Sequence, residues 1–139
     1  MSNKVKRTER GWAGHLIVSD SCRFRRNTLL EYKDKKWIVS TIGCFINSER
    51  RIDTIGYNRW YETMAFEGYE QNGYIEGDVS KHIDFDSEWG LWAESREELF
   101  EKYPHPDNDA NKMHEAVVEE LIHRLEEMEK CANENHTES

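Results

Sequence analysis

Three arginines lie close together in residues 22–32, a segment that also carries an aromatic ring and small polar side chains. Arg25, Arg26 and Thr28 are the members best suited to contact a phosphate. Guanidinium groups form forked hydrogen bonds to phosphate oxygens and stack on base faces, which an ammonium group does poorly. This pattern indicates a pocket for a phosphorylated, nucleotide-like ligand. The alternative, equally open, is a solvated strand face whose arginines pair with neighbouring acids.

Two further pairs of residues could contribute to such a pocket. Arg59 and Tyr61 alternate along an expected strand, so the two side chains should share one face. Asn111 and His114 are three residues apart on an expected helix and should share a face of it. We expect both pairs to contribute to a second, nucleotide-like site near the helix. Asn111 and His114 would contact the polar edge of a ligand there, or else meet solvent.

Aromatic rings are frequent in the chain, which has five Trp, six Tyr and five Phe. Trp12 and Trp89 are candidates for stacking on a base, an interaction worth about 1–3 kcal/mol in an open groove. The ordinary interpretation of each ring is that it packs in the core.

Motifs for catalysis and cofactor binding are not found in the sequence. It contains no GxSxG, HExxH, GxGxxG or GxxxxGK[ST] pattern. Cys22, Cys44 and Cys131 are widely spaced and form no CxxC pair, so neither a zinc site nor a disulfide framework is expected. We therefore expect a binding protein that is not an enzyme and uses no metal or cofactor.

Charge is distributed unevenly over the 139 residues. Residues 1–36 carry ten Lys and Arg against four acids, whereas residues 94–139 carry five against fourteen, and the net charge is −9. Repulsion from phosphates disfavours binding to long nucleic acids. No apolar run is long enough to cross a membrane, and no secretory signal is recognised, so we expect a cytoplasmic protein.

The pattern of elements predicts an α+β fold. Six antiparallel strands are expected, at about residues 14–19, 25–32, 37–43, 52–55, 59–66 and 78–86, with a turn at Asn72–Gly73. A short helix over 95–102, capped by Ser95 in the pattern Ser-x-x-Glu, should follow. A long helix, capped by Asp107, Asn108 or Asp109, should then run to about Lys130. We expect residues 1–10 to be a flexible basic arm, 11–130 a single ligand-binding domain and 131–139 a frayed tail.

Several segments together resemble a family of small phage proteins. They are GWAGH (11–15), RFRRNTLLEY (23–32), VSTIG (39–43), RWYETMAF (59–66), DVS (78–80) and ANKMHEAVV (110–118). The chain resembles the first type of phage anti-Thoeris protein over residues 11–128. That resemblance implies dimers that can build hexamers in the host bacterial cytoplasm. It also implies sequestration, without cleavage, of glycocyclic ADP-ribose made by a TIR-domain enzyme and, in some members, of cyclic di- or trinucleotides.

Two other functions are compatible with the sequence. An inhibitor could bind a basic host defence protein through the acidic C-terminal helix. An enzyme could degrade a nucleotide signal with acids and His114. We rank the signal sponge first, the protein-binding inhibitor second and the enzyme third.

Overall fold

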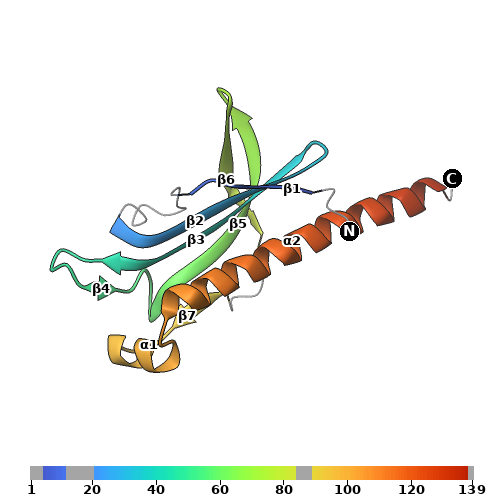
Figure 1. Cartoon of the computed structure of the whole chain (residues 1–139). Helices are drawn as coiled ribbons and strands as arrows, with labels where there is room; N and C mark the ends of the chain where they lie inside the picture. Colours follow the sequence, from blue (N-terminus) through green and yellow to red (C-terminus); the bar gives the residue numbers. More distant parts are fainter. Residues whose placement is uncertain (1–4, 12–20, 84–88, 138–139) are drawn as a thin grey trace.

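The computed structural model of the chain describes residues 5–11, 21–83 and 89–137, and their side chains except 79–80, 82–83 and 128–137. Trp12 and the strand expected at 14–19 lie outside the described residues. The fold is α+β, as predicted: an antiparallel sheet is followed by two helices (Figure 1).

Within the described residues the sheet has seven strands, which are β1 (Lys6–Glu9), β2 (Cys22–Tyr32), β3 (Lys35–Ile46), β4 (Ile52–Asp53), β5 (Arg59–Gln71), β6 (Tyr74–Ile83) and β7 (Gly90–Trp92). Five of them lie side by side in the order β1-β2-β3-β5-β6, while β4 pairs with β3 and β7 with β5. All pairs are antiparallel. The predicted turn at Asn72–Gly73 joins β5 to β6, and both residues have a positive φ.

Two helices complete the chain, α1 (Arg96–Lys102) and α2 (Pro106–Thr137). The Ser95 hydroxyl accepts from the Glu98 amide at 3.1 Å, which confirms the predicted cap of α1. Helix α2 crosses one face of the sheet, and its last turns extend past the strands (Figure 1). Among the described residues, neither helix has the length and apolar character needed to span a membrane.

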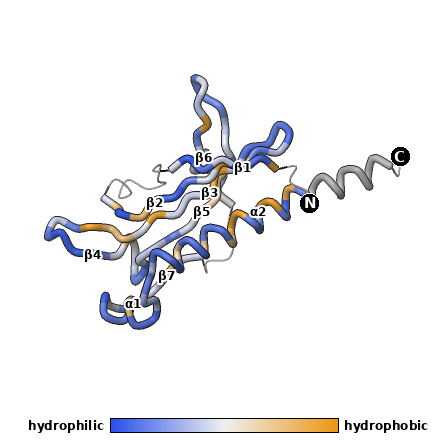
Figure 2. Tube along the Cα trace, viewed as in Figure 1, coloured by the Kyte–Doolittle hydropathy of each residue, from blue (hydrophilic) through white to orange (hydrophobic). Residues whose placement is uncertain are grey.

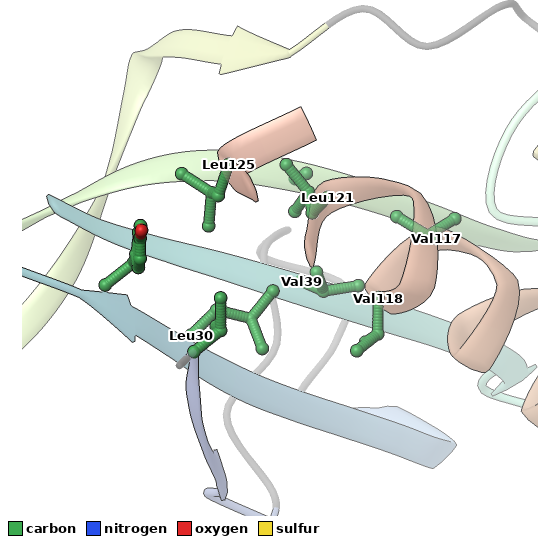
Figure 3. Packing of buried hydrophobic residues seen from close by; sticks show 9 residues of the cluster. Leu30, Val39, Val117, Val118, Leu121 and Leu125 are labelled. Carbon is green, nitrogen blue, oxygen red and sulfur yellow. The ribbon is translucent and has the colours of Figure 1, made fainter. Parts of the chain in front are cut away.

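The main core lies between α2 and the sheet. In Figure 3, Val117, Val118 and Leu121 of α2 pack against Leu30 and Val39 of the central strands, and each is at most 1% exposed. Hydrophobic positions recur along α2 between hydrophilic ones (Figure 2), as a stripe of three- and four-residue spacing requires. Burial of such side chains contributes roughly 1.5–3 kcal/mol each.

Both ends of the chain differ from the expectation. Residues Lys6–Glu9 were expected in a mobile arm, but they form β1 and pair with residues 28–31 of β2. Helix α2 continues to Thr137 and therefore includes most of the segment expected to be frayed. It also begins at Pro106, one to three residues before the expected cap, because proline is well suited to the first helical position.

Candidate functional site

Four of the predicted site residues come together between β2 and α2. Side chains alternate along a strand, so Arg26 and Thr28 of β2 both point toward the helix. Asn111 and His114 lie on the face of α2 that meets them. This combination differs from the expectation, which placed Asn111 and His114 in a second site together with Arg59 and Tyr61.

His114 is the buried centre of this group, with 0% of its surface exposed. Its Nε2 lies 2.7 Å from the Thr28 hydroxyl and its Nδ1 lies 2.7 Å from the Thr41 hydroxyl. The Thr41 hydroxyl is in turn 2.6 Å from that of Thr63. Burial, assisted by the nearby Arg26 charge, lowers the pKa of His114 to about 4, so its ring is neutral at pH 7.

Thr28, His114, Thr41 and Thr63 form a row of hydrogen-bonded side chains, and their partners determine which atom donates at each step. The Thr28 hydroxyl donates to a Glu9 carboxylate oxygen at 2.7 Å, so it must accept from His114. His114 therefore carries its proton on Nε2, and its bare Nδ1 accepts from Thr41. Thr63 is left to donate to Thr41. The row thus satisfies each hydroxyl and both ring nitrogens beneath the helix.

Arg26 links this buried row to the surface. Its guanidinium donates to Glu9 at 3.2 Å, to the Asn111 side-chain oxygen at 3.3 Å and to Glu115 at 2.9 Å. Arg7 donates to Glu115 at 2.8 Å. Two guanidiniums thus face two carboxylates, and the cluster has no net charge. Arg26 does pair with acids, as the alternative sequence interpretation expected.

The two carboxylates are held in their ionised form. Hydrogen bonds from Arg7, and then from Arg26, lower the pKa of Glu115 to about 2 despite partial burial. Burial of Glu9 by itself raises its pKa, but the bonds from Arg26 and Thr28 outweigh this and lower it. A shallow hollow of about 370 Å³ lies beside the cluster on α2, lined by Asn111, Glu115 and Lys112 among others.

Arg59 and Tyr61, expected on one face of the strand, have different partners in the structure. The Tyr61 hydroxyl donates to Asp107 at 2.7 Å, at the start of α2, whereas Arg59 forms an ion pair with Glu62. The register of β5 against β7 shifts between Arg59 and Tyr61, which breaks simple alternation there.

Two other candidates, Arg25 and Trp89, lie within the described residues. Arg25 is on the opposite face of the sheet from Arg26, because adjacent strand residues point to opposite sides. Trp89 packs, partly buried, against the main core, and its carbonyl accepts from the Thr63 amide at 3.1 Å. This agrees with the ordinary interpretation of a core ring.

The sequence interpretation missed Glu9, Glu115 and the threonines of β3 and β5. Glu115 could have been found, because it follows Asn111 by four residues on the helix. Glu9 could not, since it lies in the segment expected to be mobile. In the part of the chain that the structure describes, no group of three or more His, Cys, Asp or Glu side chains is placed to hold a metal ion.

Comparison with known proteins gives no relative: no protein-family model, no curated protein and no solved structure matches this chain.

Proposed function

We propose that this chain is a phage-encoded immune evasion protein that binds a cyclic nucleotide signal and sequesters it without cleavage. The observation that carries the proposal is the convergence of Arg26, Thr28, Asn111 and His114 from two elements far apart in sequence. Glycocyclic ADP-ribose is the ligand class that we expect first, with cyclic di- and trinucleotides as related ligands.

Arg26 is the residue suited to receive a phosphate. Its side chain is 21% exposed, while Thr28 and His114 beneath it are fully buried and fix its surroundings. Glu9 and Glu115 already occupy its donors with carboxylate oxygens, the same kind of acceptor that a phosphate presents. A bound phosphate would replace one of these carboxylates at Arg26.

The chemistry of the buried groups favours binding over turnover. His114 has both ring nitrogens engaged and a pKa of about 4, so it is poorly placed to act as a general base at neutral pH. Burial raises the pKa of Cys22 to about 11 and raises that of Cys44 as well. Both thiols are then protonated and weak as nucleophiles.

Self-association is part of the proposal. The last turns of α2 run beyond the sheet that covers its earlier turns (Figure 1). An isolated helical stretch of this length is marginal in water, so packing against a second copy would stabilise it. A subunit boundary would also help to exclude water from a bound ligand and slow its release.

Isothermal titration calorimetry with glycocyclic ADP-ribose and with a cyclic trinucleotide tests this proposal. We expect binding of at least one ligand, recovery of that ligand intact after heat denaturation, and at least tenfold weaker binding by Arg26→Gln. Arg124→Gln is the matched control, because it removes the same charge from a pair on the surface of α2.

The result that overturns the proposal is the absence of heat with either ligand at high protein concentration. Recovery of a cleaved ligand would instead favour an enzyme. Far-UV circular dichroism of both variants shows whether a loss of binding reflects a loss of folding.

A further inference from the structure

A second hollow, of about 450 Å³, lies where α1 and the start of α2 meet the end of the sheet. Its volume is within the range of small-molecule sites, roughly 300–1,000 Å³. The side chains that matter for recognition are Arg23, Tyr61, Phe100, Pro104, Asp107 and Asn108. None of these except Tyr61 belongs to the residues predicted from the sequence.

The floor of the hollow is buried and held by several contacts. Tyr61 is 1% exposed, its ring meets Phe24 edge-on at 5.8 Å, and its hydroxyl donates to Asp107. Cys44 also lines the hollow; its φ of 56° departs from extended backbone, and it packs in one cluster with Tyr61 and Leu99. A floor fixed in this way needs little reordering when a ligand binds.

The rim offers a free aromatic face. Phe100 of α1 is 40% exposed, whereas its neighbour Leu99 is fully buried. Pro104 lies in the short connection between the two helices and adds a second apolar surface to the lining. A planar ring placed here would cover apolar area that water now contacts, and base stacking on an exposed ring is worth about 1–3 kcal/mol.

The polar groups at the hollow suit a ligand edge that carries hydrogen-bond donors and acceptors better than they suit a simple anion. The backbone amides of Asn108 and Asp109 both donate to the His105 carbonyl. These two N–H groups are therefore already engaged within the first turn of α2 and do not point to an anion site. Asp107 uses one carboxylate oxygen for Tyr61 and keeps acceptor capacity on the carboxylate. The Asn108 amide can donate and accept.

We propose that this hollow binds an amino-bearing nucleobase, which stacks on Phe100 and donates its exocyclic amino group to Asp107. Arg23 at the edge of the hollow would contact a phosphate attached to that nucleoside. The inference rests on the proposed function and deepens it by naming the base subsite. Asp107 and Asn111 are one turn apart on α2, about 6 Å along its axis. One ligand can therefore contact this hollow with its base and reach toward Arg26 with a phosphate.

Adenosine and inosine are the probes that test the base subsite, because inosine has an oxygen where adenosine has the amino group. We expect adenosine to shift the backbone NMR signals of Asp107, Asn108 and Phe100, and inosine to bind at least tenfold more weakly. Phe100→Ala should weaken adenosine binding about tenfold. Tyr69→Ala is the matched control, an exposed aromatic on the β5–β6 hairpin outside the hollow, and should bind as the unmodified chain does.

Two results overturn the inference: adenosine at millimolar concentration that shifts none of these signals, or equal binding by Phe100→Ala and Tyr69→Ala. A third outcome is that glycocyclic ADP-ribose binds in an Arg26-dependent way while adenosine shifts no signal of the hollow. In that case the base subsite is refuted and the proposed function stands. If adenosine binds in the hollow and no cyclic nucleotide binds at all, the base subsite stands and the sequestration proposal is refuted.

Discussion

The ring of Tyr61 fills the space beside the backbone of Gly43, its antiparallel partner across β3 and β5. A Cβ atom added to Gly43 would lie 2.1 Å from Tyr61 Cδ2, closer than any real contact. Glycine at position 43 therefore sets the position of Tyr61, and through it the bond to Asp107 that anchors the start of α2.

Gly43→Ala should destabilise the fold by about 1–3 kcal/mol, because the ring of Tyr61 has to move within a packed core. Urea unfolding of the purified variant measures the change. Gly68→Ala is the control: its Cβ would come no closer than 3.2 Å, to a methyl of Ile75, so a smaller loss is expected. Equal losses for the two variants would contradict the role assigned to Tyr61.

Thr28→Val should cost about 1–3 kcal/mol of unfolding free energy, since it leaves Glu9 without one donor and His114 without an acceptor at a buried site. Thr8→Val is an isosteric control on β1, where no such row is broken. The comparison is made by chemical denaturation at pH 7. A Thr28 variant as stable as the Thr8 variant would show that the hydrogen-bonded row contributes nothing net.

Stability should fall on acidification through the titration of His114. Its pKa is about 4 in the folded chain against an ordinary value of 6.5, so the unfolded chain binds more protons between these two pH values. The titration of His114 leaves the free energy of unfolding unchanged above about pH 6.5. It lowers this free energy as the pH falls toward 4, by about 2 kcal/mol at pH 5. The pKa of Glu115 is about 2 in the folded chain, against an ordinary value of 4.5. The free energy of unfolding should therefore decrease further as the pH falls below 4.5.

Chemical denaturation at pH 7 and pH 5 checks this dependence. In His114→Gln, the difference in unfolding free energy between pH 7 and pH 5 should be much smaller than in the unmodified chain, whatever the stability of the variant at pH 7. His123→Gln, at an exposed position of the same helix, should keep it. A His114 variant with an unchanged pH dependence would assign the acid sensitivity to other groups.

Deleting residues 128–139 should reduce the oligomeric state without unfolding the subunit. Among the described side chains, Leu125 is the last core residue of α2, so the deletion keeps all of these core contacts. Light scattering coupled to size exclusion measures both masses; we expect a dimer or larger for the full chain and a monomer for the shortened one. A full chain that is monomeric at high concentration would refute self-association.

The sequence predicted the fold class and the helices well because their signals are local. The spacing of Val117, Leu121 and Leu125 and the cap at Ser95 each depend on a few neighbouring residues. The mutual approach of Arg26 and Thr28 with Asn111 and His114 was not predicted. Alternation and helical spacing indicate which side chains share a face, but not which face of the sheet the helix covers.

What the sequence could not provide are relationships set by register. Glu9 reaches Arg26 only because β1 pairs with β2, and nothing in the composition of a charged N-terminal segment indicates a strand. The separation of Arg59 from Tyr61 follows from an irregular pairing with β7, which lies some thirty residues away in the chain. The hollow beside Phe100 depends on how three elements meet, and no local pattern encodes it.

The short strand β1 also has a consequence for aggregation. Among the described strands it is the outermost on its side of the sheet. It is four residues long, and three of these residues are charged. Short, charged edge strands discourage sheets from joining one another. Trimming the first ten residues as a dispensable leader would uncover the eleven-residue strand β2, whose unpaired backbone groups would then be free to template association between chains.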